Sequence, residues 1–124
     1  MQEIKNLDAM MVPGRVIPQA EMRLAEALNN YAWLVCNTEG DLKEALQFSL
    51  RSLKITEDSA KLDTCARCYF AVGDLGSAIR MQQRALKLDP YSPPLKRQLR
   101  EFQQAKQKAD AGSAAGETGK TKAN

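Results

Sequence analysis

The sequence predicts an all-α fold, in which two similar helical hairpins are followed by a helix that caps them. The stretches EGDLKEALQFSLRSLKITE and VGDLGSAIRMQQRALKLDP share a Gly-Asp-Leu start at an offset of 33 residues. The segments before them repeat one apolar helical face at an offset of 34 residues. Aromatic residues make up 6% of the chain, and this low content favours helices because strands are rich in aromatic side chains.

The N-terminal segment, residues 1–18, is expected to be partly ordered. The stretch QEIKNLDAMM has the composition of a short helix, and Pro13, Gly14 and Pro18 interrupt the chain after it. A longer helix is predicted from about Gln19 to Asn37. The apolar pair Met10 and Met11 is placed so that it would cover the exposed side of the first repeat.

The first repeat spans about residues 26–59 and the second about 60–93. Leu28, Ala32 and Val35 follow the spacing i, i+4, i+7, which places them on one helical face. The second repeat has the same face, formed by Leu62, Ala66 and Tyr69. A period near 34 residues is typical of repeated helix–turn–helix units.

Each Gly-Asp pair predicts the turn inside a hairpin. Gly40 and Gly73 can adopt the left-handed conformation that ends a helix. Asp41 and Asp74 can then accept hydrogen bonds from the free N–H groups of the next helix, worth about 1 kcal/mol each. Small side chains are expected where two helices approach closely, and these are Ala32, Ala45, Ala66, Ala78 and Ala85.

A capping helix is predicted over residues 93–109. Two prolines begin it, which suits the first turn of a helix. Leu95, Leu99 and Phe102 form its apolar face, as expected for a terminal unit that seals a stack and turns a polar face outward. Residues 110–124 are small, polar and rich in glycine, so a disordered tail is expected there.

The chain resembles the tetratricopeptide repeat (TPR) family, and in particular bacterial TPR proteins, over roughly residues 19–108. The second repeat carries the better match, with the family's characteristic positions occupied by Leu62, Ala66, Tyr69, Gly73, Asp74, Ala78, Ala85 and Pro90. The first repeat departs from the pattern, because Ser52 stands where alanine is usual and Glu57 replaces the terminal proline. The resemblance implies right-handed stacking of the hairpins and a concave groove lined by the first helix of each.

We expect no enzymatic activity, cofactor or metal. The chain has no histidine, the commonest general base, and shows no Gly-rich phosphate loop. The motif CARC, Cys65 to Cys68, leaves thiol chemistry or metal binding open. Structural use is the favoured interpretation, because Cys65 falls on the apolar face beside Leu62 and Tyr69.

The resemblance to TPR proteins implies a protein or peptide partner in the groove. The helix faces opposite the apolar ones supply the candidate residues, namely Asn29, Trp33 and Asn37 in the first repeat and Asp63, Arg67 and Phe70 in the second. Aromatic and arginine side chains often anchor interfaces. Simpler roles stay open: Trp33 could pack against residues 1–18, Asp63 could pair with Arg67, and Phe70 could pack into the next hairpin.

Charge leaves two alternatives to a peptide-binding scaffold. The chain carries a net charge of +3, and its basic excess lies at the C-terminal end, where Lys96, Arg97, Arg100, Lys106 and Lys108 could contact nucleic acid or an acidic surface. The chain could instead be a structural segment that ends a larger repeat array. A cytoplasmic location is expected, because no signal peptide or membrane-spanning stretch is visible and the cysteine count is odd and small.

Overall fold

The computed structural model describes the backbone of residues 17–123 and the side chains of residues 17–113. This part of the chain forms the helices α2 (Gln19–Asn37), α3 (Leu42–Ile55), α4 (Ser59–Ala71), α5 (Leu75–Leu88) and α6 (Pro93–Ala123). No strand occurs between residues 17 and 123, so the all-α prediction is confirmed. Residues 1–16, including Met10 and Met11, lie outside the described residues, and so does most of the predicted N-terminal segment.

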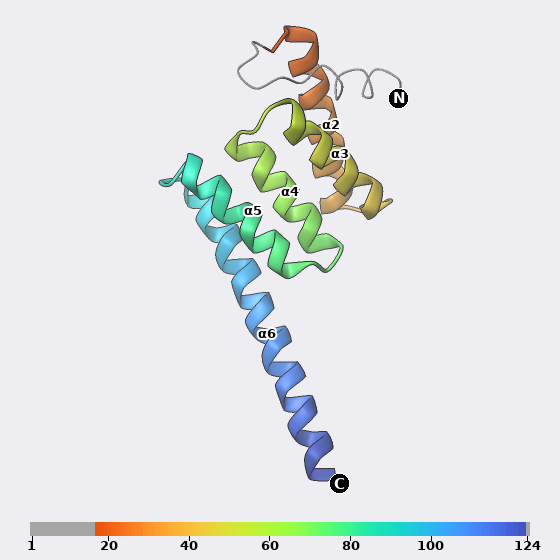
Figure 1. The fold of residues 1–124 in the computed structure, drawn as a ribbon, viewed down its shortest axis with the longest axis vertical. Coiled ribbons are helices and arrows are strands. Elements are labelled where there is room, and N and C mark those ends of the chain that lie inside the picture. Colours follow the sequence, from red (N-terminus) through yellow and green to blue (C-terminus); the bar gives the residue numbers. More distant parts are fainter. Residues whose placement is uncertain (1–16, 124) are drawn as a thin grey trace.

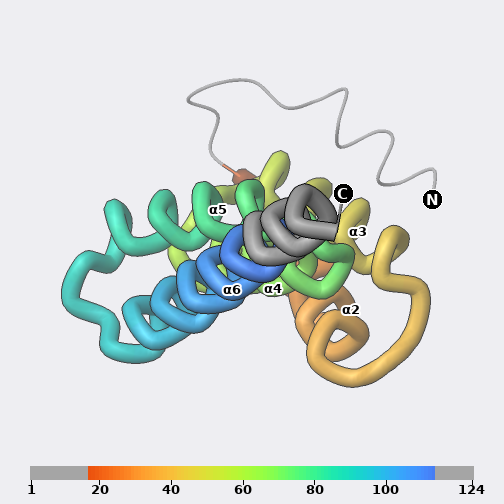
Figure 2. Tube along the Cα trace, turned by 90° about the horizontal axis from the view of Figure 1, so that it is seen from below, coloured from red at the N-terminus to blue at the C-terminus, as the bar shows by residue number. Residues whose placement is uncertain are grey.

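The helices form two hairpins and a final helix (Figure 1). Helix α2 packs along α3, and α4 packs along α5. The two hairpins stack because α4 also contacts both α2 and α3, and α6 then packs on α5. Figure 2 shows α3 and α5 on one side of this stack and α2 and α6 on the other. The arrangement is the repeat-like fold that the sequence predicts.

Both Gly-Asp pairs lie at the bends of the hairpins. Gly40 has φ = +141° and Gly73 has φ = +90°, backbone angles that residues with a Cβ rarely adopt. Asp41 begins α3 by accepting a hydrogen bond from the Glu44 amide at 3.1 Å. Asp74 begins α5 in the same way, with the Ser77 amide at 3.1 Å. The predicted turn chemistry is therefore present in both repeats.

The close contacts between helices involve small side chains. The alanines predicted for these positions are fully buried, namely Ala32, Ala45, Ala66, Ala78 and Ala85. Ser52 is fully buried as well, and its hydroxyl donates to the Ala25 carbonyl at 2.7 Å. This hydrogen bond satisfies the Ser52 hydroxyl, since a buried hydroxyl is costly without a partner.

Helix α6 closes the stack with its apolar face. Phe102 is fully buried against Ala66 and Ala78, and Leu95 is buried against Leu62. The sequence predicts an end near residue 109 and a disordered tail, whereas the helix continues to Ala123. Residues 103–111 contain mainly glutamine, lysine and alanine, which favour helix even without tertiary contacts.

Candidate binding groove

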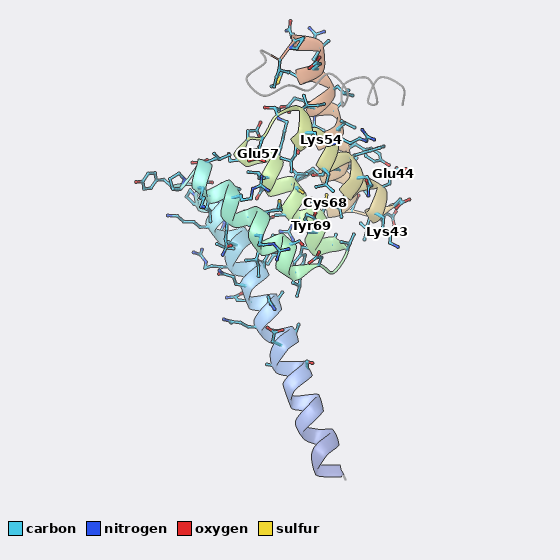
Figure 3. The ribbon with its side chains drawn as sticks, viewed as in Figure 1. Lys43, Glu44, Lys54, Glu57, Cys68 and Tyr69 are labelled. Carbon is cyan, nitrogen blue, oxygen red and sulfur yellow. The ribbon has the colours of Figure 1, made fainter. Side chains whose placement is uncertain are left out.

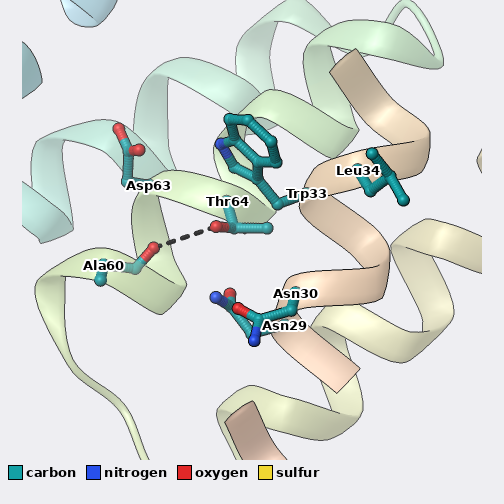
Figure 4. Close-up of a pocket in the computed structure, with 7 residues that line it drawn as sticks. All are labelled: Asn29, Asn30, Trp33, Leu34, Ala60, Asp63 and Thr64. Carbon is teal, nitrogen blue, oxygen red and sulfur yellow. Dashed lines mark hydrogen bonds between the residues drawn. The ribbon is translucent and has the colours of Figure 1, made fainter. Parts of the chain in front are cut away.

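A groove lies between α2 and α4, on the side of the stack formed by the first helices of the two hairpins (Figure 4). Its volume is about 530 Å³. Helix α2 contributes four lining residues and α4 contributes three, namely Asn29, Asn30, Trp33, Leu34, Ala60, Asp63 and Thr64. Three of the predicted site residues, Asn29, Trp33 and Asp63, are therefore brought together in one place.

The apolar part of the groove is exposed to solvent. The Trp33 side chain is 51% exposed and the Leu34 side chain 53% exposed. Large apolar side chains that stay accessible beside a concavity mark binding surfaces more often than isolated ones do. Trp33 is the one tryptophan of the chain, so its fluorescence reports directly on this groove.

Asp63 is the one charged residue among those that line the groove. Its Oδ1 accepts hydrogen bonds from the Gln82 Nε2 at 2.8 Å and from the Gln98 Nε2 at 2.7 Å. Both donors are neutral amides, and Asp63 forms no ion pair within residues 17–113. Burial raises the pKa of the Asp63 carboxyl above its ordinary value, although the Gln82 hydrogen bond and the nearby Arg67 charge oppose this shift.

Asn29 contributes an unpaired acceptor. The residue is 9% exposed, and its Oδ1 is buried with no hydrogen-bond partner among the described residues. An unsatisfied buried acceptor costs roughly 1–3 kcal/mol. The neighbouring Thr64 differs, because its hydroxyl donates to the Ala60 carbonyl at 3.2 Å (Figure 4). The charged acceptor in the groove is the partly buried carboxylate of Asp63.

Arg67 and Phe70 hold helix α6 and do not line the groove. The Arg67 guanidinium forms a salt bridge with Glu101 at 2.7 Å and donates to the Gln98 Oε1 at 2.8 Å. Phe70 stacks on Phe102, with ring centroids 4.7 Å apart. The guanidinium carbon of Arg67 lies 5.0 Å from the Phe102 centroid, within cation–π range. At the second repeat, α6 covers the face that the sequence assigned to a partner.

Asn37 also has a local role. Its Nδ2 donates to the Trp33 carbonyl at 2.7 Å, which satisfies a free carbonyl at the end of α2. In its place the groove includes Asn30, Leu34, Ala60 and Thr64. A groove between two neighbouring helices is lined by several residues from the facing side of each helix. The 34-residue offset pairs Asn30 with Thr64 just as it pairs Asn29 with Asp63, so that offset could have identified Asn30 and Thr64. It could not have identified Leu34 and Ala60, because it pairs them with residues outside the groove.

A buried lysine links the two hairpins at one end of the groove. The Lys61 side chain is 2% exposed, and its Nζ lies 2.6 Å from the Glu26 Oε1 and 2.8 Å from the Asp58 Oδ2. Burial lowers the pKa of Lys61, but the hydrogen bonds to Asp58 and Glu26 outweigh it, so the pKa is raised above its ordinary value. Burial likewise raises the pKa of Asp58, but its hydrogen bonds with Lys61 outweigh this and lower it.

The three cysteines belong to the core or its edge. Cys65 and Cys68 are fully buried, and Figure 3 shows Cys68 among the helices, whereas Lys43 and Glu44 point outward. Burial raises the pKa of Cys65 to about 11, and it raises the pKa of Cys36 and Cys68 as well. Between residues 17 and 113, no cluster of three or more cysteine or carboxylate groups is arranged to hold a metal. Buried thiols with raised pKa values are poor nucleophiles and poor metal ligands.

The basic residues of α6 lie on its solvent-facing side. Lys96, Arg97, Arg100 and Lys108 are exposed, and Lys106 pairs with Asp110 at 3.1 Å. None of the helices in the described part of the chain has the length and hydropathy of a membrane span.

Comparison of the chain with protein-family models, curated proteins and solved structures finds no match.

Proposed function

We propose that this chain is a non-catalytic, TPR-like scaffold that binds an extended peptide segment of a partner protein in the groove between α2 and α4. The observation that carries the proposal is the exposed indole of Trp33 beside the buried Asn29 and the partly buried Asp63, all lining one groove. Aromatic anchors next to a few fixed polar groups are the usual composition of a peptide-binding site.

The open shape of the groove supports a peptide better than a small molecule, because small-molecule pockets bury most of their ligand. The groove is open to solvent along exposed residues of α2, including Asn30 and Leu34, and it does not enclose its contents. A volume of about 530 Å³ can hold a few side chains of an extended segment. Helix α6 fills the equivalent space at the second repeat, where Gln98 and Glu101 bind Arg67.

Selection from a displayed library of random nine-residue peptides tests this proposal. The wild-type protein is expected to enrich a set of related peptides, and Trp33→Ala is expected to bind them at least tenfold more weakly, because it removes the aromatic anchor. Tyr91→Ala is the matched control, because Tyr91 is an 85% exposed aromatic residue outside the groove. Failure to enrich any peptide, or equal loss in both variants, would refute the proposal.

A further inference from the structure

The groove combines two features that favour the same ligand group. Asp63 is a partly buried carboxylate whose direct hydrogen-bond donors are neutral amides. Trp33 presents an exposed aromatic surface across the groove, from α2. Each of these features is satisfied by a positively charged hydrogen-bond donor.

We infer that the groove selects a peptide with an arginine side chain, whose guanidinium lies against the Trp33 indole and donates hydrogen bonds to the Asp63 carboxylate. This inference rests on the proposed function, since it names the chemistry of the peptide that the same groove takes. Arginine fits better than lysine, because a planar guanidinium stacks on an indole and can form two parallel hydrogen bonds with a carboxylate.

The charges around the groove favour a cation over an anion. Lys61 is already shared by two carboxylates, those of Glu26 and Asp58. Arg67 is engaged by Glu101. Neither cation is left over to receive an acidic peptide, and the remaining charge of the groove is the carboxylate of Asp63. A partner with negative charge here would be repelled by the Asp63 carboxylate, and the cation near that carboxylate, Arg67, is already paired with Glu101.

The chain contains its own example of this recognition. Arg67 lies over the rings of Phe70 and Phe102, at 5.4 Å and 5.0 Å from their centroids, and binds a carboxylate at 2.7 Å. The 34-residue offset places Trp33 in the first repeat where Arg67 stands in the second. The aromatic surface is thus present at the first repeat, and a guanidinium has to come from the ligand.

The test begins with the composition of the selected peptides. Arginine is expected to be enriched at one fixed position of the peptides captured by the wild-type protein. The best peptide is then synthesised in two forms, with arginine or with citrulline at that position, because citrulline has nearly the same shape and no charge. Both peptides are made without tryptophan, so their affinity for the protein can be measured from the fluorescence of Trp33, the one tryptophan of the chain.

The arginine form is expected to bind the wild-type protein at least about tenfold more tightly than the citrulline form, the usual difference for a charge-assisted hydrogen bond. In Asp63→Asn the ratio of the affinities for the arginine and citrulline forms is expected to fall below about threefold. The control variant Asp110→Asn is expected to keep the wild-type ratio. Asparagine keeps the Oδ1 that accepts from Gln82 and Gln98, so the variant is expected to stay folded, and its circular dichroism checks this.

Two outcomes separate this inference from the proposed function. Peptides captured through Trp33 without a preference for arginine, or with equal affinity for the citrulline form, would overturn the arginine assignment and leave the groove as a peptide site. An unchanged ratio in Asp63→Asn would also overturn it. Absence of any Trp33-dependent peptide would overturn both proposals together.

Discussion

At the scale of single residues, the two turn glycines are fixed by backbone conformation. Alanine at Gly73 must adopt φ near +90°, which costs about 1–2 kcal/mol of unfolding free energy. Alanine at Gly40 is expected to cost more, because its Cβ would also lie 3.1 Å from the Val35 Cγ1. Urea denaturation of Gly73→Ala and Gly40→Ala measures both effects.

Gly76 provides the control for the glycine variants. It lies inside α5 with ordinary helical backbone, and a Cβ there would make only a normal contact with the Arg80 side chain at 3.5 Å. Gly76→Ala is therefore expected to stabilise the protein by about 0.5–1 kcal/mol, the usual gain for alanine in a helix. Equal behaviour of the three alanine variants would contradict the turn assignment.

The buried side chain of Lys61 stabilises the fold mainly by filling space between the hairpins. Both of its partners, Glu26 and Asp58, are about half exposed and can be solvated without it. Lys61→Met is therefore expected to stay within about 1 kcal/mol of the wild type, because an apolar isostere avoids the cost of burying the charge. Lys61→Ala is expected to lose about 2–4 kcal/mol through the cavity it leaves.

The pH dependence of Lys61 provides a second readout. Because its folded pKa is raised above its ordinary value, its ionic contribution is complete below about pH 10.5 and is lost as the pH rises through the folded pKa. Above that pH, the wild type should therefore lose unfolding free energy relative to Lys61→Met. A difference that stays constant from pH 8 to pH 12 would show that the ion pairs contribute nothing.

At the scale of the helices, α6 is attached through a short segment around Phe102. Phe102→Ala is expected to destabilise the protein by about 3–5 kcal/mol, because this fully buried ring packs against Ala66, Ala78 and Phe70. Residues 107–113 are exposed. A chain that stops after Asp110, which keeps the Lys106–Asp110 ion pair, is therefore expected to unfold at the wild-type urea concentration. A large loss on truncation would contradict this division of α6.

The hairpins were predictable from the sequence because local chemistry determines them. Gly40, Asp41, Gly73 and Asp74 specify the bends by backbone conformation and capping, which depend on few neighbours. The continuation of α6 was not predictable from composition alone, because Gly112 and the polar side chains around it are compatible with either coil or helix. A local pattern indicates which conformations are allowed, but it does not select one where no tertiary contact contributes.

The groove was only half predictable, for a different reason. Helical periodicity shows which face a residue lies on, and Trp33 and Asp63 were identified in that way. It does not show what covers that face, and Arg67 and Phe70 were assigned to a partner although Glu101 and Phe102 of α6 contact them. The same limit applies to Gln82 and Gln98, whose hydrogen bonds to Asp63 join three helices. No periodic pattern in the sequence predicts these hydrogen bonds.

At the scale of the whole molecule, the core is expected to unfold as one unit. The buried clusters share helices from one end of the stack to the other: Cys68 of α4 packs with Ala32 of α2, and Ala66 of α4 packs with Phe102 of α6. Loss of Phe102 should therefore lower the urea midpoint seen by Trp33 fluorescence in α2 as much as the midpoint seen by helical circular dichroism. A fluorescence midpoint that stays at the wild-type value would show that the first hairpin unfolds independently.

The length of α6 also determines how the molecule moves in solution. The C-terminal part of α6 runs away from the hairpins (Figure 1). Residues 111–123, which follow the part of α6 that lies beside Ile79, are about 20 Å long at 1.5 Å per residue. A compact chain of this size would have a radius of gyration of about 14 Å. The projecting part of α6 makes the molecule elongated, so its rotational diffusion is slower about the transverse axes than about the long axis. The NMR relaxation rates of amides in this part of α6 will therefore differ from those of amides in the hairpins.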